Sequence, residues 1–149
     1  MKHIFKYWAP LCLYAGIIFY MSSLSHPLPS ISIPYFDKFI HIVEYSIFGI
    51  LAARALKNSP RVVFNKNFIM FAVLITVAYG ASDEFHQIFV PFRACDVFDL
   101  TADLIGGTIG SLIYSIKCTS LRVPTKSGRS NLKKKRVPSS AKVLWRTRD

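Results

Sequence analysis

The sequence predicts an all-α protein, a four-helix transmembrane bundle followed by a disordered basic tail. Four apolar segments cover residues 4–24, 39–56, 68–90 and 97–116, and each has 18 to 23 residues. A helix needs roughly 20 residues to cross a hydrocarbon core of about 30 Å. Lys and Arg are also distributed unevenly, because 17 of the 19 can be placed on one side of a membrane while seven of the eight acids lie toward the other. We therefore expect one small multi-pass domain in the cell membrane.

The positive charge predicts the orientation of this domain. Basic residues lie at the N-terminus, in the loop after the second segment and throughout the tail, so the positive-inside rule places these parts in the cytoplasm. Both termini are then cytoplasmic, and the connections 25–36 and 91–96 face outward. We expect residues 1–118 to form the transmembrane domain and residues 119–149 to lie against anionic lipid headgroups as a disordered tail. Nucleic acid is not the expected partner of the net charge of +11, because Lys133–Arg136 is a lone basic run without a recognisable binding fold.

The first two segments have distinct boundaries. The first ends at Ser22 and Ser23, and no convincing small-residue cleavage site follows it, so we interpret it as an uncleaved span and not as a signal peptide. Three prolines between residues 27 and 34 disfavour a regular helix in the following connection. Asp37 is placed to start or cap the second helix, where an acid suits the helix dipole.

The last two segments carry polar residues close to their outer ends. The turn signal Asn58-Ser59-Pro60 separates the second segment from the third. The third segment reaches spanning length only if it carries residues 83–87 within the outer leaflet. Pro91 is expected to close the third helix, and Asp96 is expected to open the fourth.

Small residues in the fourth segment predict a close helix contact. Gly106 and Gly110 form a G-x-x-x-G pair, and Ala102 extends the row by one turn. Side chains this small let two helices approach closely in lipid. We interpret the row as packing within the bundle and not as a dimer interface.

Polar residues form a stripe on three of the four helices, and their spacings of three and four residues place each stripe on one face. The stripes are Asp37, His41 and Glu44; then Tyr79, Asp83, His86 and Gln87, with Glu84 rotated by about 100° from Asp83; then Asp96, Asp99 and Asp103. In the expected topology, all three stripes lie in the outer half of the membrane. They should therefore converge on one cavity that opens to the outside. Seven acids face only Lys38 and Arg93 as permanent bases, which favours a functional site over a purely structural network.

The same residues resemble the VanZ-like family over approximately residues 8–114. The matching motifs are Asp37-Lys38-x-x-His41-x-x-x-Tyr45 with Gly49, Tyr79 before Asp83-Glu84-x-x-Gln87, Pro91-x-Arg93, Asp99 before Gly106 and Gly110, and the pair Ser22-Ser23. Two positions depart from the pattern: Phe92 stands where glycine is frequent, and Asp103 stands where asparagine is frequent. The resemblance implies a multi-pass membrane protein of a family named for low-level resistance to the glycopeptide teicoplanin.

Our leading hypothesis is an envelope protein that binds or modifies the headgroup of a lipid or of a lipid-linked wall precursor. An enzymatic version uses His41 or His86 as general base and Glu44, Asp83 or Glu84 as acid or metal ligand, without any established metal signature. Arg93 could then clamp a phosphate or carboxylate. The alternatives are a small transporter or proton-coupled channel, and a non-catalytic membrane partner. The expected ligand-binding residues are Asp37, Lys38, Tyr45, Tyr79, Gln87, Arg93, Asp96, Asp99 and Asp103. The sequence assigns no cofactor.

Overall fold

The protein is all-helical throughout the residues that the structure describes. This computed structural model describes residues 2–25, 35–93 and 95–120, with side chains from residue 5 onward. Its helices are α1 (Lys2–Ser22), α2 (Phe36–Lys57), the short α3 (Val62–Lys66), α4 (Phe68–Gln87) and α5 (Val97–Ser120). The expected tail and most of the connection between the first two helices lie outside the described residues.

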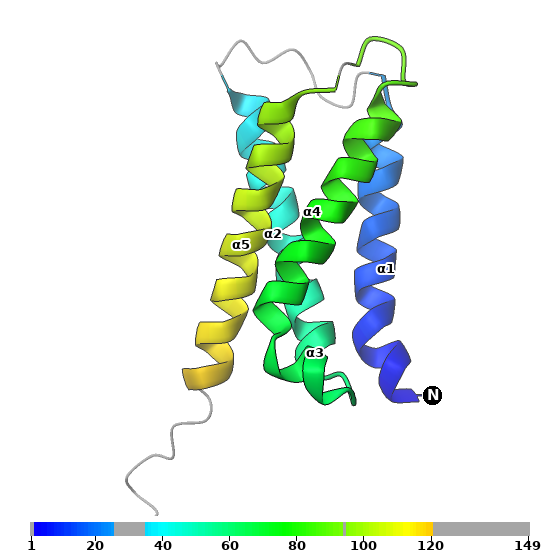
Figure 1. Cartoon of the computed structure of the whole chain (residues 1–149). Helices are drawn as coiled ribbons and strands as arrows, with labels where there is room; N and C mark the ends of the chain where they lie inside the picture. The colour runs from blue at the N-terminus through cyan, green and yellow to red at the C-terminus, as the bar shows by residue number, and fades with distance from the viewer. Residues whose placement is uncertain (1, 26–34, 94, 121–149) are drawn as a thin grey trace, which may run out of the picture.

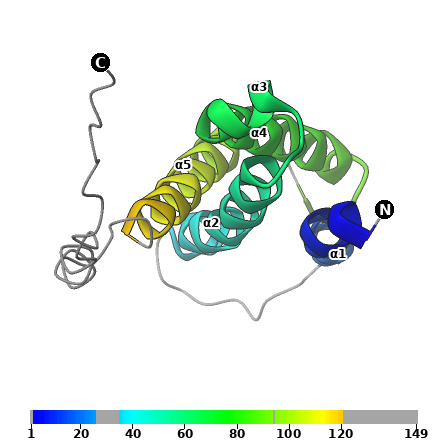
Figure 2. The same cartoon turned by 90° about the horizontal axis from the view of Figure 1, so that it is seen from below.

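The four long helices run up and down in alternation, so that the C-terminal ends of α1 and α4 lie beside the N-terminal ends of α2 and α5 (Figure 1). Seen along the bundle, α2, α4 and α5 form a compact group, and α1 lies at the edge (Figure 2). By length and composition, α2, α4 and α5 could each cross a membrane. Large apolar side chains such as Met70, Leu74 and Ile113 are about half exposed. Such a surface is typical of helices that face lipid.

The observed helix ends refine the expected ones. Helix α4 ends at Gln87 instead of residue 90, because residues 89 and 90 turn back with N–H bonds to His86 and Gln87. Helix α5 continues to Ser120 instead of residue 116. Asp37 does not cap α2: Tyr35 holds that position with a left-handed backbone, and Asp37 lies in the first turn.

Asp96 does open α5 as expected. Its side-chain oxygen accepts the Phe98 backbone N–H at 2.8 Å, and its carbonyl accepts the N–H of Asp99 at 3.0 Å. The cap satisfies backbone groups that have no partner within the helix.

The glycines of α5 bring it against α2, and this pair has the most extensive interface of the bundle. Gly106 faces the backbone of Ile42, and Gly110 faces the backbone of Ser46 one turn further along. A Cβ atom at either glycine would overlap the carbonyl opposite. The G-x-x-x-G pair therefore packs within the chain, as the sequence predicts.

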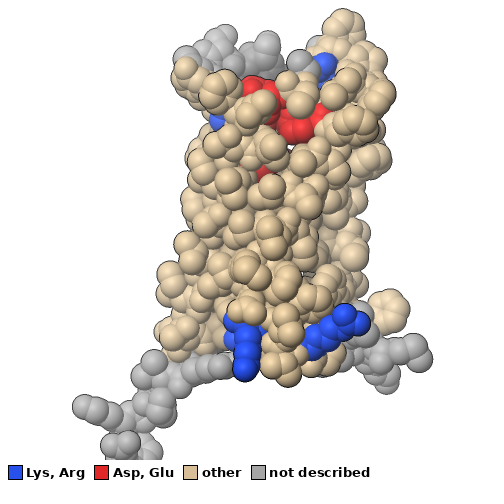
Figure 3. Space-filling model, in the orientation of Figure 1, with Lys and Arg blue, Asp and Glu red and all other residues tan. Residues whose placement is uncertain are grey.

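Acidic, basic and apolar side chains are unevenly distributed along the length of the bundle. Acidic side chains gather near the end where α2 and α5 begin, beside a few basic side chains, and a group of basic side chains without acidic neighbours lies at the other end (Figure 3). At the basic end, Arg54 lies over the Tyr7 ring at 5.3 Å and Lys57 lies over the Phe68 ring at 4.7 Å. The apolar core lies toward this end and includes Leu11, Phe48, Ala52, Leu56, Phe68 and Ala72.

Candidate functional site

A cavity of about 370 Å³ lies between α1, α2 and α4, and the connection from α4 to α5 also borders it. Its polar lining consists of Tyr14, Ser22, Asp37, His41, Glu44, Asp83, Gln87 and Arg93. Its apolar lining consists of Ile18, Met21, Phe36, Phe39, Ile40, Val43 and Ile47. The volume falls in the usual range for small-molecule pockets, and the mixed lining suits an amphipathic ligand.

Lys38 joins α2 to the beginning of α5. Its Nζ atom lies 2.5 Å from Asp96 Oδ2, 2.5 Å from Asp99 Oδ1 and 3.0 Å from Asp37 Oδ2. The hydrogen bond from Lys38 holds the pKa of Asp96 below its usual range, and the bond from the Phe98 N–H acts in the same direction. One ammonium thus partly neutralises three carboxylates.

His41 and Asp103 form a second polar contact, deeper in the bundle. His41 Nδ1 lies 2.8 Å from Asp103 Oδ1, and the Asp103 side chain is fully buried. Gly80 of α4 leaves room for this carboxylate, because a Cβ there would lie 2.7 Å from Asp103 Oδ2. Tyr45 stacks its ring parallel to His41, with centroids 6.3 Å apart.

Several buried polar atoms near the cavity have no hydrogen-bond partner among the described residues. Gln87 Nε2 donates to Asp83 Oδ2 at 3.2 Å, and the backbone N–H of Asp96 donates to Glu84 Oε2 at 2.9 Å. The other oxygen of each carboxylate accepts no hydrogen bond. The atoms left without a hydrogen bond are Ser22 Oγ, Tyr45 Oη, Asp83 Oδ1, Glu84 Oε1, Asp99 Oδ1 and Asp103 Oδ2, of which Asp99 Oδ1 still has its ion pair with Lys38. Buried polar atoms normally find a partner, so this concentration favours a ligand site.

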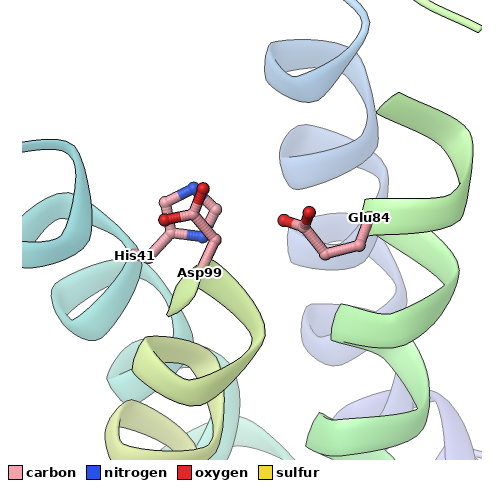
Figure 4. A group of neighbouring side chains, drawn as sticks. All are labelled: His41, Glu84 and Asp99. Carbon is pink, nitrogen blue, oxygen red and sulfur yellow. The ribbon is translucent and has the colours of Figure 1, made fainter. Parts of the chain in front are cut away.

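Three of the candidate residues come close enough to share a metal ion. His41, Glu84 and Asp99 each offer a ligand atom, and these atoms lie within 4.8 Å of one another. The Glu84 carboxylate of α4 points across the bundle toward the other two side chains, which come from α2 and α5 (Figure 4). Three helices distant in sequence thus contribute to one group.

The structure brings most of the expected residues together and separates a few from them. Asp37, His41, Glu44, Asp83, Gln87 and Arg93 line the cavity. The other residues of the three stripes, which we also expected there, are not among its lining residues: Tyr79, Glu84, His86, Asp96, Asp99 and Asp103. Asp99 and Asp103 instead contact Lys38 and His41 from α5.

His86 lies apart from the cluster. Its Nε2 atom lies 3.1 Å from Ser23 Oγ, and its ring packs on Phe19 of α1 with centroids 4.6 Å apart. The buried face of α4 is centred between Asp83 and Glu84. This places Glu84 inside and turns His86 toward α1, contrary to the expectation that His86 shares a face with Asp83.

Tyr79 donates a hydrogen bond to a backbone carbonyl within α1, and Arg93 donates to a backbone carbonyl just after the end of α1. Tyr79 Oη donates to the Ala15 carbonyl at 2.5 Å, and its ring stacks on Phe48. Arg93 donates through Nε and one Nη to the Leu24 carbonyl at 3.4 Å. Both contacts tie α1 to the rest of the site, a role that the sequence did not indicate.

Sequence reasoning missed the contribution of α1 to the cavity. Tyr14, Ile18 and Met21 all line it, and Ile18 is almost fully buried. The only signal in this helix was the pair Ser22-Ser23 at its end, since α1 carries no charge near the cavity.

The arrangement defines a class of protein: a helical membrane bundle with a buried carboxylate and histidine cluster beside an amphipathic cavity. A family model described as VanZ/LLP1 matches residues 7–118. The chain therefore belongs to the VanZ/LLP1 family. Comparison with curated proteins and with solved structures gave no match.

Proposed function

We propose that this protein is a four-span membrane protein whose outward-facing cavity binds the headgroup of a cell-envelope lipid. The observation that carries the proposal is the mixed lining of the cavity. By helix periodicity, the lining residues Phe39, Val43 and Ile47 lie on one edge of the cavity face of α2. Asp37, His41 and Glu44 lie on the other edge, so the cavity has an apolar side and a polar side. A lipid needs both kinds of wall, because its headgroup forms hydrogen bonds and its chains do not. Lipid-linked wall precursors have the same amphipathic chemistry.

The apolar side supports entry from the membrane. Four of the apolar lining residues are also substantially exposed, namely Met21 of α1 and Phe39, Val43 and Ile47 of α2. Exposed lining residues indicate that the cavity opens along α1 and α2, on a lateral surface where lipid chains would be found.

The polar side supports a headgroup that is rich in hydrogen-bond donors. Asp37, Glu44 and Asp83 line it with carboxylates, and the guanidinium of Arg93 is directed to a backbone carbonyl. Ammonium or sugar hydroxyl groups can donate to carboxylate oxygens. An ethanolamine lipid or a glycosylated precursor meets this requirement better than a purely anionic headgroup.

The orientation is part of the proposal. The group of basic side chains at the end opposite the acids (Figure 3) supports cytoplasmic termini and a polar side that faces outward. Helix α1, with 21 residues, would provide the fourth span. A wall precursor held on the outer side would connect this chain to the teicoplanin resistance for which the family is named.

The packing favours binding over transport. Below the polar cluster the bundle is closed by Phe48, Ala52, Leu56 and Ala72, all of which are almost fully buried. A relay of ions or protons needs polar groups or water along the whole path. Among the described residues, the acidic and histidine side chains stop halfway, and the buried hydroxyls of Thr76 and Ser111 beyond them bond to the backbone of their own helices. This arrangement supports a binding site better than a conduction pathway.

Native mass spectrometry after mild delipidation tests the proposal. The wild-type chain should retain one lipid. Ile40→Trp should lose it, because the larger side chain at this lining position would occupy part of the cavity. Ile113→Trp is the matched control, because Ile113 lies on α5 and does not line the cavity. Absence of a retained lipid in the wild type, or equal retention in both variants, would contradict the proposal.

A further inference from the structure

We infer that His41, Glu84 and Asp99 form a binding site for one divalent transition-metal ion, such as Zn²⁺ or Mn²⁺. Their potential ligand atoms lie within 4.8 Å of one another. Zinc binds nitrogen and oxygen ligands at about 2.0–2.2 Å, which brings two ligands on one ion to at most about 4.4 Å apart. Small side-chain rotations would therefore close the site around the ion.

Glu84 provides the independent indication of a ligand. Its side chain is 97% buried, since its exposed fraction is 3%. One carboxylate oxygen is fixed by the Asp96 N–H at 2.9 Å, and the other has no hydrogen-bond partner among the described residues. The carboxylate points toward His41 and Asp99 (Figure 4). A buried carboxylate oxygen without a partner is costly, and a bound cation would remove that cost.

His41 is held in a form that suits metal binding. Asp103 Oδ1 lies 2.8 Å from Nδ1, and its side chain is fully buried. In the tautomer that carries its proton on Nδ1 and donates it to Asp103, the lone pair is on Nε2, which would then be the ligand atom. Carboxylate, histidine and metal in series are a common arrangement, in which the carboxylate fixes the tautomer and the ring orientation.

Asp99 already pairs with the ammonium group of Lys38, which would compete with a metal ion for this carboxylate. Its Oδ1 atom lies 2.5 Å from Lys38 Nζ, which also contacts Asp96 and Asp37. Lys38 can therefore release Asp99 to a metal ion and keep two other carboxylates. Removal of the Lys38 charge should consequently strengthen metal binding.

The ligand set indicates the class of metal. One imidazole with two carboxylates suits Zn²⁺ or Mn²⁺, whereas Mg²⁺ and Ca²⁺ prefer oxygen ligands alone. Three protein ligands leave a coordination position for water or for an oxygen of another molecule. His41 also lines the cavity, so that molecule would be the headgroup. This last link rests on the proposed function, but binding of the metal does not.

Metal titration of the purified full chain tests the inference. The protein is prepared in mild detergent without a histidine tag, stripped with chelator and titrated with Zn²⁺ and with Mn²⁺. We expect one ion per chain and a higher melting temperature, because an ion that binds only the folded state stabilises it. Glu84→Gln and Asp99→Asn should each weaken binding about tenfold or more. His86→Ala is the control and should leave the affinity unchanged, because His86 contacts α1 instead.

Lys38→Met provides a test in the opposite direction. It should bind Zn²⁺ several-fold more tightly than the wild type, a gain that misfolding cannot imitate. Absence of saturable binding to the wild type, or Lys38→Met binding no tighter, would overturn the inference. Lipid retention is also measured after the chelator treatment, which distinguishes the two proposals. A chain that retains its lipid but does not bind Zn²⁺ would contradict the metal site and leave the lipid-binding proposal intact.

Discussion

Substitution of Gly110 by alanine should weaken the bundle at its tightest helix contact. A Cβ at this position would lie 2.8 Å from the carbonyl carbon of Ser46 and 3.0 Å from the amide nitrogen of Ile50, and closer still to the Ser46 carbonyl oxygen. Ordinary contacts of this kind begin at 3.4 Å. The closest of these contacts requires the backbones of α2 and α5 to separate by about 1 Å or more, and a gap of about 1 Å forfeits about half of the dispersion energy of each affected contact.

The expected loss is moderate. Overpacking typically costs about 1–3 kcal/mol, and the better helix propensity of alanine offsets up to about 1 kcal/mol. We therefore expect Gly110→Ala to lower the free energy of unfolding by about 1–2 kcal/mol. The measurement is thermal unfolding of the purified chain in detergent, followed by size-exclusion chromatography of the heated samples.

Gly16→Ala is the matched control, because nothing lies within 4 Å of a Cβ at that position in α1. It should leave the melting temperature unchanged or raise it slightly. If Gly110→Ala had the melting temperature of the wild type and Gly16→Ala had a lower one, the close approach of α2 and α5 would be wrong.

Three further predictions concern the connection after α4, the effect of pH and the topology. Phe92 has φ 63°, a left-handed conformation that is costly for a bulky side chain. Phe92→Gly should therefore raise the free energy of unfolding, measured by denaturation, by about 1 kcal/mol. An unchanged or lower free energy of unfolding would contradict backbone strain at this position. The hydrogen bond from Lys38 lowers the pKa of Asp96, so the stabilisation of the fold by this contact should be present above about pH 4 and be lost as the pH falls through the folded pKa. Asp96→Asn lacks this contribution, so its melting temperature should vary less with pH in this range. Equal acid sensitivity of the two proteins would exclude the contribution. In a background without native cysteines, an impermeant thiol reagent should label Ser30→Cys but not Ser139→Cys in intact cells, and the reverse pattern would invert the topology.

The stripes on α2 and α5 could be predicted from the sequence because helix periodicity fixes which residues share a face. Asp37, His41 and Glu44 do line one cavity, and Gly106 and Gly110 do pack on α2. These predictions required only the spacing of residues within one helix and the cost of polar groups in lipid.

The remaining features depend on contacts between helices, which spacing alone does not determine. The rotation of α4 decides that Glu84 faces Asp99 and that His86 faces α1. Periodicity allows either choice, because His86 and Glu84 lie on opposite sides of Asp83, about 60° and 100° away around the helix. The binding of Arg93 to the Leu24 carbonyl likewise depends on the path of the connection after α4.

The backbone at Phe92 bears on one departure from the family pattern. This position, at which the family pattern frequently has glycine, has a positive φ in this chain. The loop therefore keeps a conformation that suits glycine, although the side chain is phenylalanine. The substitution was visible in the sequence, but its conformational consequence required the structure.

Photo-crosslinking in membranes tests the proposed lipid-binding cavity most directly. A benzophenone amino acid is placed at Ile47, which lines the cavity and is 42% exposed, or at Ile109 of α5, which is 41% exposed and does not line it. The cavity position should capture lipids of one headgroup class, and Gln87→Ala should reduce these adducts. The control position should capture the bulk lipid mixture with or without that change. Identical adducts at both positions, insensitive to Gln87→Ala, would contradict a specific lipid site.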